Sequence, residues 1–106
     1  MAGTEYAAGA VLSVALAKLY TTRWCPYCVR ARMLLSDLGV EFDEIDVGAQ
    51  PELRREMMDL SGRHTVPQIW IGDQHIGGFD DMNALHRAGQ LVPLIESTGA
   101  ATKPNH

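Results

Sequence analysis

The chain has two cysteines, Cys25 and Cys28, which stand three positions apart in the stretch RWCPYC. A disulfide between such near neighbours closes almost no loop, so a purely structural role is not expected. Zinc usually takes two cysteine pairs, or one pair with spaced histidines, and none of the four histidines stands in an HxxxH arrangement. The pair is therefore interpreted as a reactive dithiol that exchanges with disulfides.

The elements around the pair place its first sulfur at a helix N-terminus. Residues 15–21 read as a short apolar strand, and Pro26 suits the first turn of a following helix that Gly39 can end. Unpaired N–H groups and the positive end of the helix dipole would favour a thiolate on Cys25. Cys28, one helical turn further, would be the resolving thiol.

Charge is distributed unevenly along the chain. Residues 18–32 hold four cations and no anion, whereas residues 37–59 hold eight acids and two arginines. The basic stretch favours a reactive thiolate, although the arginines could equally be solvated surface residues. A formal net charge of −4 argues against general nucleic-acid binding.

The middle of the chain predicts a second strand and a second helix. Residues 40–47 are rich in strand-forming residues, although their apolar phase slips between Phe42 and Ile45. Pro51 can open a helix that Gly62 ends. The apolar residues expected to share one face of that helix are Leu53, Met57 and Leu60.

The remaining pattern predicts a hairpin and a last helix. Gly72-Asp73 is a two-residue hairpin signal between two short β-type runs. Asp80 or Asp81 can cap a helix that ends at Gly89. The order β-α-β-α-β-β-α predicts an α/β protein, a mixed four-stranded sheet flanked on both faces by about three helices.

The chain ends are expected to lie outside one domain that spans residues 18–95. An apolar run at residues 7–17 has no preceding Lys or Arg, so it is a poor signal peptide, and it is too short to cross a bilayer. We expect residues 1–17 to be a flexible leader or an extended start, and residues 96–106 to be a tail. Cytoplasm is the expected location, with no membrane partner and with a monomer as the working form.

Three motifs over residues 18–95 resemble those of bacterial-type dithiol glutaredoxins: CPYC at 25–28, TVP at 65–67 and GGFDD at 77–81. The resemblance implies the thioredoxin-like fold, glutathione as co-substrate and no metal. It makes Cys25 the nucleophile, Cys28 the resolving thiol and Pro67 a cis-proline. The glutathione contacts that it implies are Arg23, Tyr27, Arg54, Thr65, Val66, Pro67, Gly78, Phe79, Asp80 and Asp81.

Each implied contact also has a plainer structural interpretation. Tyr27 could be an ordinary surface aromatic, and Arg54 a solvated helix residue. Three positions depart from the family pattern: Thr22 stands where a lysine is frequent, Trp24 replaces Thr or Ser, and Phe79 replaces Cys or Ser. Arg23 could substitute for the lysine.

The activity that the resemblance implies is reduction of protein–glutathione mixed disulfides and of protein disulfides, with ribonucleotide reductase among the candidate partners. Two alternatives stay open. One is a glutathione-ligated [2Fe-2S] cluster shared by two chains, although Pro26 resembles the class that generally holds none. The other is a redoxin that thioredoxin reductase reduces, against which the implied glutathione contacts weigh.

Overall fold

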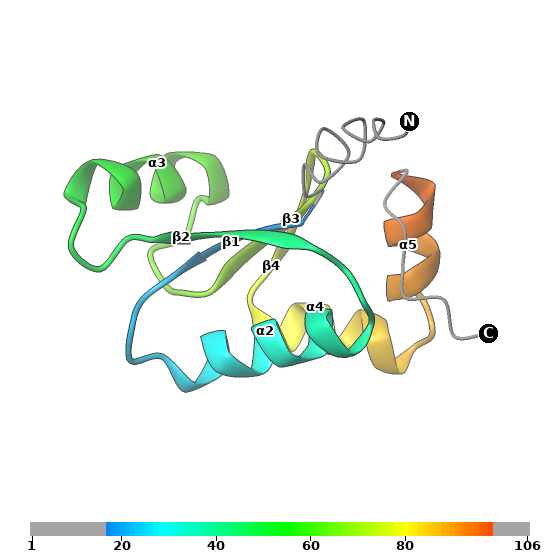
Figure 1. Cartoon of the computed structure of the whole chain (residues 1–106). Coiled ribbons are helices and arrows are strands. Elements are labelled where there is room, and N and C mark those ends of the chain that lie inside the picture. Colours follow the sequence, from blue (N-terminus) through cyan, green and yellow to red (C-terminus); the bar gives the residue numbers. More distant parts are fainter. Residues whose placement is uncertain (1–16, 99–106) are drawn as a thin grey trace, which may run out of the picture.

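The computed structural model describes residues 17–98 and shows one mixed four-stranded sheet (Figure 1). The strands are β1 (Ala17–Thr21), β2 (Phe42–Asp46), β3 (Gln68–Ile71) and β4 (Gln74–Gly77), in the spatial order β2-β1-β3-β4. β1 and β2 are parallel, and β3 is antiparallel to both of its neighbours. The predicted α/β class and mixed sheet are confirmed. Any leader before residue 17, and most of the expected tail, lie outside the described residues.

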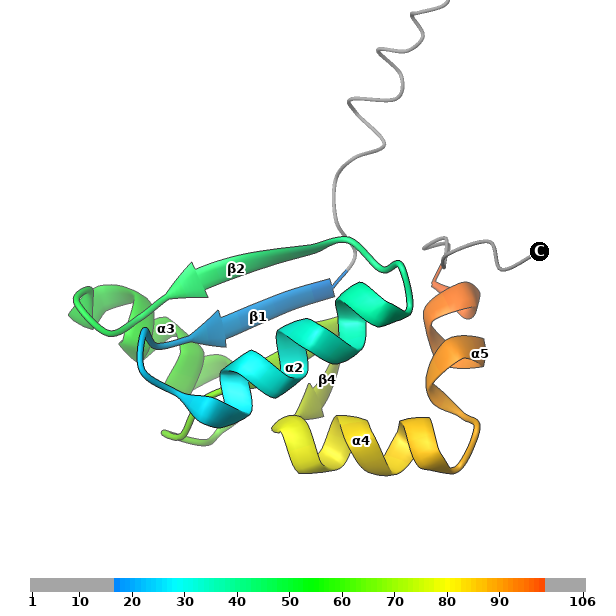
Figure 2. The same ribbon diagram turned by 60° about the horizontal axis from the view of Figure 1, so that its bottom comes forward.

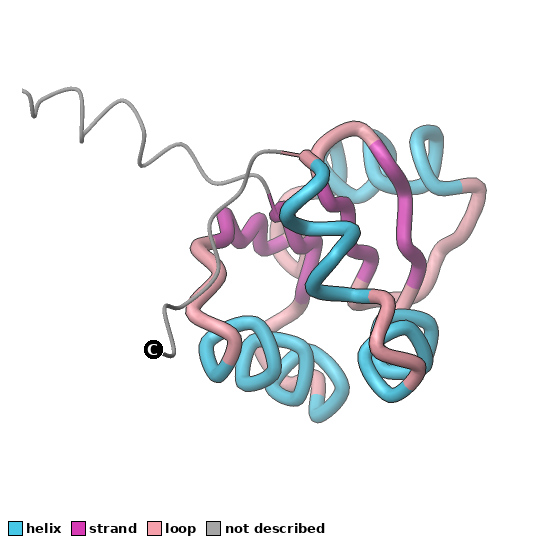
Figure 3. Tube along the Cα trace, turned by 90° about the vertical axis from the view of Figure 1, so that its right-hand side faces the viewer, coloured by secondary structure: helices cyan, strands magenta, loops and turns pink. Residues whose placement is uncertain are grey.

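Helices cover both faces of the sheet, so each face builds its own apolar cluster (Figures 1 and 3). The helices are α2 (Pro26–Asp37), α3 (Pro51–Ser61), α4 (Phe79–Arg87) and α5 (Leu91–Ser97). Residues of β1, β3, α2, α4 and α5 form the larger cluster. Tyr20, Val47 and Met57 form the smaller one, under α3. None of the helices within residues 17–98 has the length and apolar composition needed to cross a bilayer.

The phase slip in β2 has a simple structural reason. Side chains three positions apart on a strand point to opposite faces. Phe42 packs against the larger cluster, whereas Ile45 packs against the smaller one. The strand therefore contributes one apolar side chain to each face of the sheet, which a search for simple alternation does not detect.

The predicted apolar face of α3 is only partly correct. Met57 is fully buried and Leu53 packs beside it, but Leu60 is 58% exposed. Leu60 lies in the last turn, two residues before the left-handed Gly62 (φ 72°) that ends the helix. In Figure 1, α3 lies toward one end of the sheet.

The hairpin prediction is confirmed, and the predicted aspartate cap of α4 is correct in part. Gly72 adopts a positive φ of 61° in the two-residue turn between β3 and β4. The N-cap of α4 is Gly78, not Asp80 or Asp81. Asp81 instead lies in the first turn, where its Oδ2 accepts the Gly78 N–H at 2.9 Å. The carboxylate still stabilises the helix start, but from inside the helix.

Helix α5 was not predicted from the sequence, and it makes four helices in the described chain instead of about three. This helix has only seven residues and contains Pro93, so it is too short for a helical periodicity of apolar residues to be recognised. Leu91 and Ile95 are one turn apart, and both are fully buried in the larger cluster. The helix extends to Ser97, past the point at which a tail was expected.

Burial of α5 should therefore contribute to the stability of the domain. We expect Ile95→Ala to lower the free energy of unfolding by about 2–5 kcal/mol, because it leaves a cavity in the larger cluster. Urea denaturation followed by circular dichroism measures this change. The matched control is Gln90→Ala, since Gln90 is exposed and its side chain makes no cap hydrogen bond. Equal stability of the two variants would show that α5 does not belong to the cooperative core.

Candidate active site

Cys25 is the N-cap of α2, and its sulfur accepts a backbone hydrogen bond. The residue has extended backbone angles (φ −109°, ψ 110°), and the Cys28 N–H donates to its Sγ at 3.1 Å. Pro26 follows in the first turn, where its missing N–H costs no hydrogen bond. A negative charge on this sulfur would be stabilised by the donated N–H and by the helix dipole. The side chain is partly exposed, so a disulfide can reach it.

Cys28 has the opposite environment. It lies in the first turn of α2 and is fully buried. Both cysteines are free thiols. Burial in the first place, and its hydrogen bond with Cys25 in the second, raise the pKa of Cys28 to about 12. Cys28 therefore stays protonated at neutral pH, which leaves Cys25 as the sulfur able to attack first.

The loop before β3 faces the Cys25 sulfur. The Val66–Pro67 peptide bond is cis, as the resemblance implies, and the Val66 carbonyl oxygen lies 3.8 Å from Cys25 Sγ. The thiol of Cys25 donates to this oxygen. The backbone of Val66 therefore lies beside the sulfur.

A buried glutamine, which the sequence analysis did not identify, holds this loop in place. Gln68 is fully buried, and its Nε2 donates to the Thr65 carbonyl oxygen at 3.1 Å and to Thr65 Oγ1 at 3.3 Å. Its Oε1 lies 2.7 Å from His75 Nε2 on the neighbouring strand β4. Partial burial lowers the pKa of His75, and the nearby Arg63 lowers it further. A neutral His75 can donate this hydrogen bond and keep Gln68 oriented toward Thr65.

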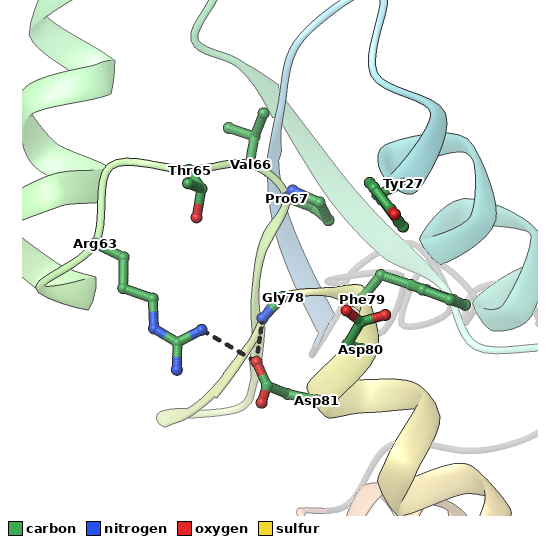
Figure 4. Close-up of a pocket in the computed structure, with 9 residues that line it drawn as sticks. All are labelled: Tyr27, Arg63, Thr65, Val66, Pro67, Gly78, Phe79, Asp80 and Asp81. Carbon is green, nitrogen blue, oxygen red and sulfur yellow. Dashed lines mark hydrogen bonds and ion pairs between the residues drawn. The ribbon is translucent and has the colours of Figure 1, made fainter.

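A groove of about 270 Å³ lies beside the cis-proline loop (Figure 4). Its lining residues come from the start of α2, the loop before β3 and the start of α4. They are Tyr27, Arg63, Thr65, Val66, Pro67, Gly78, Phe79, Asp80 and Asp81. Eight of the ten glutathione contacts implied by the sequence are in this set.

One end of the groove is polar and charged. Asp81 Oδ2 accepts from the Gly78 N–H at 2.9 Å and from Arg63 Nη1 at 3.1 Å, the two interactions drawn as dashed lines in Figure 4. These two donors lower the pKa of Asp81, the backbone N–H having the larger effect. A Cβ at Gly77 would lie 2.3 Å from Asp81 Oδ2, and the φ of Gly77 is 118°, so only glycine fits there.

The other end of the groove is aromatic. The rings of Tyr27 and Phe79 lie 6.5 Å apart, with a tilt of 33° between their planes. In Figure 4 these two side chains lie across the groove from Arg63. A bound molecule would thus meet charged groups at one end and ring surfaces at the other.

Two of the implied contacts lie outside the groove lining. The Arg23 guanidinium lies over the Trp24 ring, 5.6 Å from its centroid. Arg54 donates from Nη2 to the His64 carbonyl oxygen at 3.0 Å, which supports the loop that leads to Thr65.

Arg63 takes a place in the groove that the sequence analysis did not assign. The only signal was a cation two residues before Thr65. The side chain of Arg63 reaches the groove because the left-handed residue Gly62 ends α3 and turns the chain just before Arg63. Within residues 17–98, no cluster of three or more Cys, His, Asp or Glu side chains could hold a metal ion.

A reduced dithiol at a helix N-terminus, facing a cis-proline loop at the end of the two central strands of a mixed sheet, defines a thiol–disulfide oxidoreductase with the thioredoxin-like fold. The glutaredoxin family model matches residues 17–76. The chain belongs to the glutaredoxin family.

The comparisons with individual proteins agree. A glutaredoxin of Pseudomonas aeruginosa is 54% identical over 79 residues, covering 74% of this chain and 94% of the relative. Glutaredoxin 3 of Escherichia coli is 51% identical over 79 residues, covering 74% and 95%. Among solved structures, a buckwheat glutaredoxin–glutathione complex has a TM-score of 0.76 at 28% identity, covering 90% of this chain and 89% of that one.

The contrast between the two cysteines predicts selective alkylation. At pH 8 we expect iodoacetamide to modify Cys25, and to modify Cys28 at least about a hundredfold more slowly, because a thiol with a pKa near 12 holds almost no thiolate. Mass spectrometry of tryptic peptides locates the label. The Cys25→Ser variant should remain unlabelled until it is unfolded in urea. Equal labelling of both sulfurs in the native protein would contradict the assignment.

Asp81 predicts a pH-dependent contribution to stability. We expect Asp81→Ala to lower the free energy of unfolding by about 1 kcal/mol or less at pH 7, a modest figure because the carboxylate is half exposed. Since the folded-state pKa of Asp81 is lowered, its contribution is present above about pH 4 and is lost as the pH falls through the folded-state value.

Urea denaturation at pH 7 and near pH 3 measures the difference between wild type and Asp81→Ala. The control is Asp80→Ala, an exposed carboxylate at the neighbouring position. A stability difference for Asp81→Ala that grows toward low pH would contradict the prediction.

Proposed function

We propose that the protein is a dithiol glutaredoxin that uses glutathione to reduce protein–glutathione mixed disulfides and protein disulfides. The observation that carries the proposal is the charged and aromatic groove, lined in part by Val66, whose carbonyl oxygen lies 3.8 Å from the partly exposed Cys25 sulfur. Support also comes from the similar buckwheat protein, whose structure is described as a complex with glutathione. The site of action is the cytoplasm, where glutathione is abundant, and the working form is a monomer.

The groove offers a partner for each polar part of glutathione. The γ-glutamyl end carries a carboxylate, which the N-terminal N–H groups of α4 can receive, and an ammonium group, which Asp80 can receive. Arg63 can pair with a carboxylate through its planar guanidinium. The backbone of Val66 can pair with the peptide groups next to the cysteine of glutathione. Arg23 and Arg54 contact glutathione only if their side chains turn toward the groove.

A single thiol is enough for a glutathionylated substrate. The Cys25 thiolate attacks the glutathione sulfur of the mixed disulfide, a Cys25–glutathione disulfide forms, and the protein thiolate leaves and takes up a proton. A second glutathione then attacks the same glutathione sulfur. Oxidised glutathione leaves, and the Cys25 thiolate is regenerated.

A protein disulfide, such as one in ribonucleotide reductase, needs both cysteines. Cys25 attacks first and forms a mixed disulfide with the protein, and Cys28 then attacks the Cys25 sulfur, which releases the reduced protein. The hydrogen bond with Cys25 that raises the pKa of Cys28 is lost once Cys25 is oxidised, so Cys28 becomes easier to deprotonate at that stage. Two glutathiones reduce the resulting disulfide, whose expected potential is about −200 to −230 mV.

The first test is turnover of a small glutathione mixed disulfide by single-cysteine variants, coupled to NADPH through glutathione reductase. We expect Cys28→Ser to retain activity within about threefold, and Cys25→Ser to lose it by at least about a thousandfold, because only the first sulfur attacks. Circular dichroism confirms that both variants are folded. Loss of activity in folded Cys28→Ser would contradict the single-thiol mechanism.

Two further measurements separate this function from the alternatives. Visible absorbance after anaerobic purification would reveal a [2Fe-2S] cluster, and size-exclusion chromatography the dimer that holds it. In a second coupled assay, thioredoxin reductase replaces glutathione and glutathione reductase. NADPH consumption in that assay would indicate a redoxin that thioredoxin reductase reduces. The proposal requires a colourless protein that turns over only with glutathione.

A further inference from the structure

Apolar side chains are exposed on one side of α2, next to the candidate active site. Six large apolar residues within residues 17–98 are exposed, and four of them lie between positions 24 and 33. They are Trp24 (85% exposed), Tyr27 (50%), Val29 (42%) and Met33 (59%). Exposed apolar residues scattered singly need no explanation, but a group beside a reactive sulfur indicates a binding surface.

The helix geometry joins these residues into one surface. Val29 and Met33 are one turn apart on the side of α2 that faces away from the sheet, and Arg30 adjoins both. Trp24 precedes the N-cap, so the surface runs from the Cys25 sulfur for about 12 Å along the helix. In Figure 2, α2 lies in front of the sheet, and no other described element crosses over it. Trp24, Val29, Arg30 and Met33 are called the α2 surface below.

The α2 surface is positively charged. Arg32 points toward β2, where it pairs with Glu44, but neither Arg23 nor Arg30 is in an ion pair within residues 17–98. Both lie over aromatic rings, Arg23 over Trp24 and Arg30 over Tyr27 at 5.5 Å from its centroid.

No carboxylate of α2 lies near these cations. Residues 18–36 contain no Asp or Glu, and Asp37, at the end of the helix, lies about 10 Å along the axis from Arg30. On a chain with a formal net charge of −4, this surface is a local positive patch.

We propose that the α2 surface binds the polypeptide part of the disulfide substrate, and that it favours segments with acidic and apolar residues beside the cysteine. The inference rests on the proposed function in one respect, the role of Cys25 as the attacking sulfur. It adds a partner class: an acidic, partly apolar polypeptide segment.

The groove and the α2 surface would then divide the substrate between them. The acidic groups of the groove, Asp80 and Asp81, lie on the α4 side of Tyr27, and Arg30 lies over the ring of Tyr27. An acidic segment is attracted on the α2 side, where no acid neutralises Arg23 and Arg30. Trp and Arg are the residue types that contribute most to binding at interfaces, and Met33 can adapt its shape to different apolar partners.

The test measures attack by Cys25 without glutathione. The Cys28→Ser protein is mixed with peptides whose single cysteine carries a thionitrobenzoate group in disulfide linkage. The Cys25 thiolate attacks the peptide sulfur, a Cys25–peptide disulfide forms, and the coloured arylthiolate leaves, so absorbance gives the rate constant. One peptide has Glu and Leu beside the cysteine, its partner has Lys and Leu, and 2-mercaptoethanol carrying the same aryl group is the small reference.

We expect the acidic peptide to react about tenfold faster than the basic one, and the ratio to fall toward one in 0.5 M NaCl as the charges are screened. Arg30→Glu should reverse the preference. Each peptide rate is divided by the rate with the small reference, which corrects for any effect of a variant, Arg30→Glu above all, on the reactivity of Cys25 itself. After this division, Trp24→Ala and Met33→Ser should slow both peptides about equally. The control for net charge is Arg55→Glu on α3, at the opposite face of the sheet, which should keep the parent ratio.

The outcomes separate this inference from the proposed function. Reaction with the small reference but no preference between the peptides overturns the inference and leaves the function standing. If Arg55→Glu changes the ratio of the two peptide rate constants as much as Arg30→Glu does, the inference is also overturned, since net charge alone would then explain the preference. No reaction of Cys25 with the small reference overturns the role of Cys25, and the inference with it.

Discussion

The hydrogen bond from the Cys28 N–H to Cys25 Sγ is the interaction on which the candidate site depends. It exists because Cys25 caps α2 in an extended conformation and Pro26 starts the helix immediately after it. The same helix start turns Cys28 inward, where burial raises its pKa to about 12. One local structure thus gives two cysteine side chains different chemistry. The Cys25 sulfur can hold a negative charge, whereas the Cys28 thiol stays protonated at neutral pH.

The rest of the fold brings a binding groove to that sulfur. Cys25 follows the C-terminal end of β1. The loop before β3 lies at the same end of the sheet, because β3 runs antiparallel beside β1. Gln68, fully buried, fixes this loop through Thr65, and Gly77 lets the start of α4 approach closely enough for Asp81 to bind Arg63 and Gly78. The groove is therefore assembled from three segments that are distant in sequence.

Local patterns predicted most of the elements, because their signals lie within a few residues. Proline at the start of α2 and α3, and glycine after their ends, marked both helices to within a residue or two. The predictions that failed concerned features that depend on tertiary packing. Leu60 has the right spacing but is exposed near the end of its helix, and α5 is too short for its periodicity to be recognised. Asp81 is a capping residue, but the backbone conformation at Gly78 decided where α4 begins.

The sequence by itself predicted the dithiol and the order of the elements as far as α4, and the family resemblance of its short motifs named eight of the nine groove residues. Spacing, turn residues and short motifs are properties of neighbouring positions. Only the tertiary structure decided which cation enters the groove: Arg63 is there because α3 ends at the left-handed Gly62, whereas Arg54 binds the His64 carbonyl. It also decided which arginines stay outside ion pairs, since the pairing of Arg32 with Glu44 requires β2 to lie beside α2. Such pairings depend on distances between segments that no local pattern records.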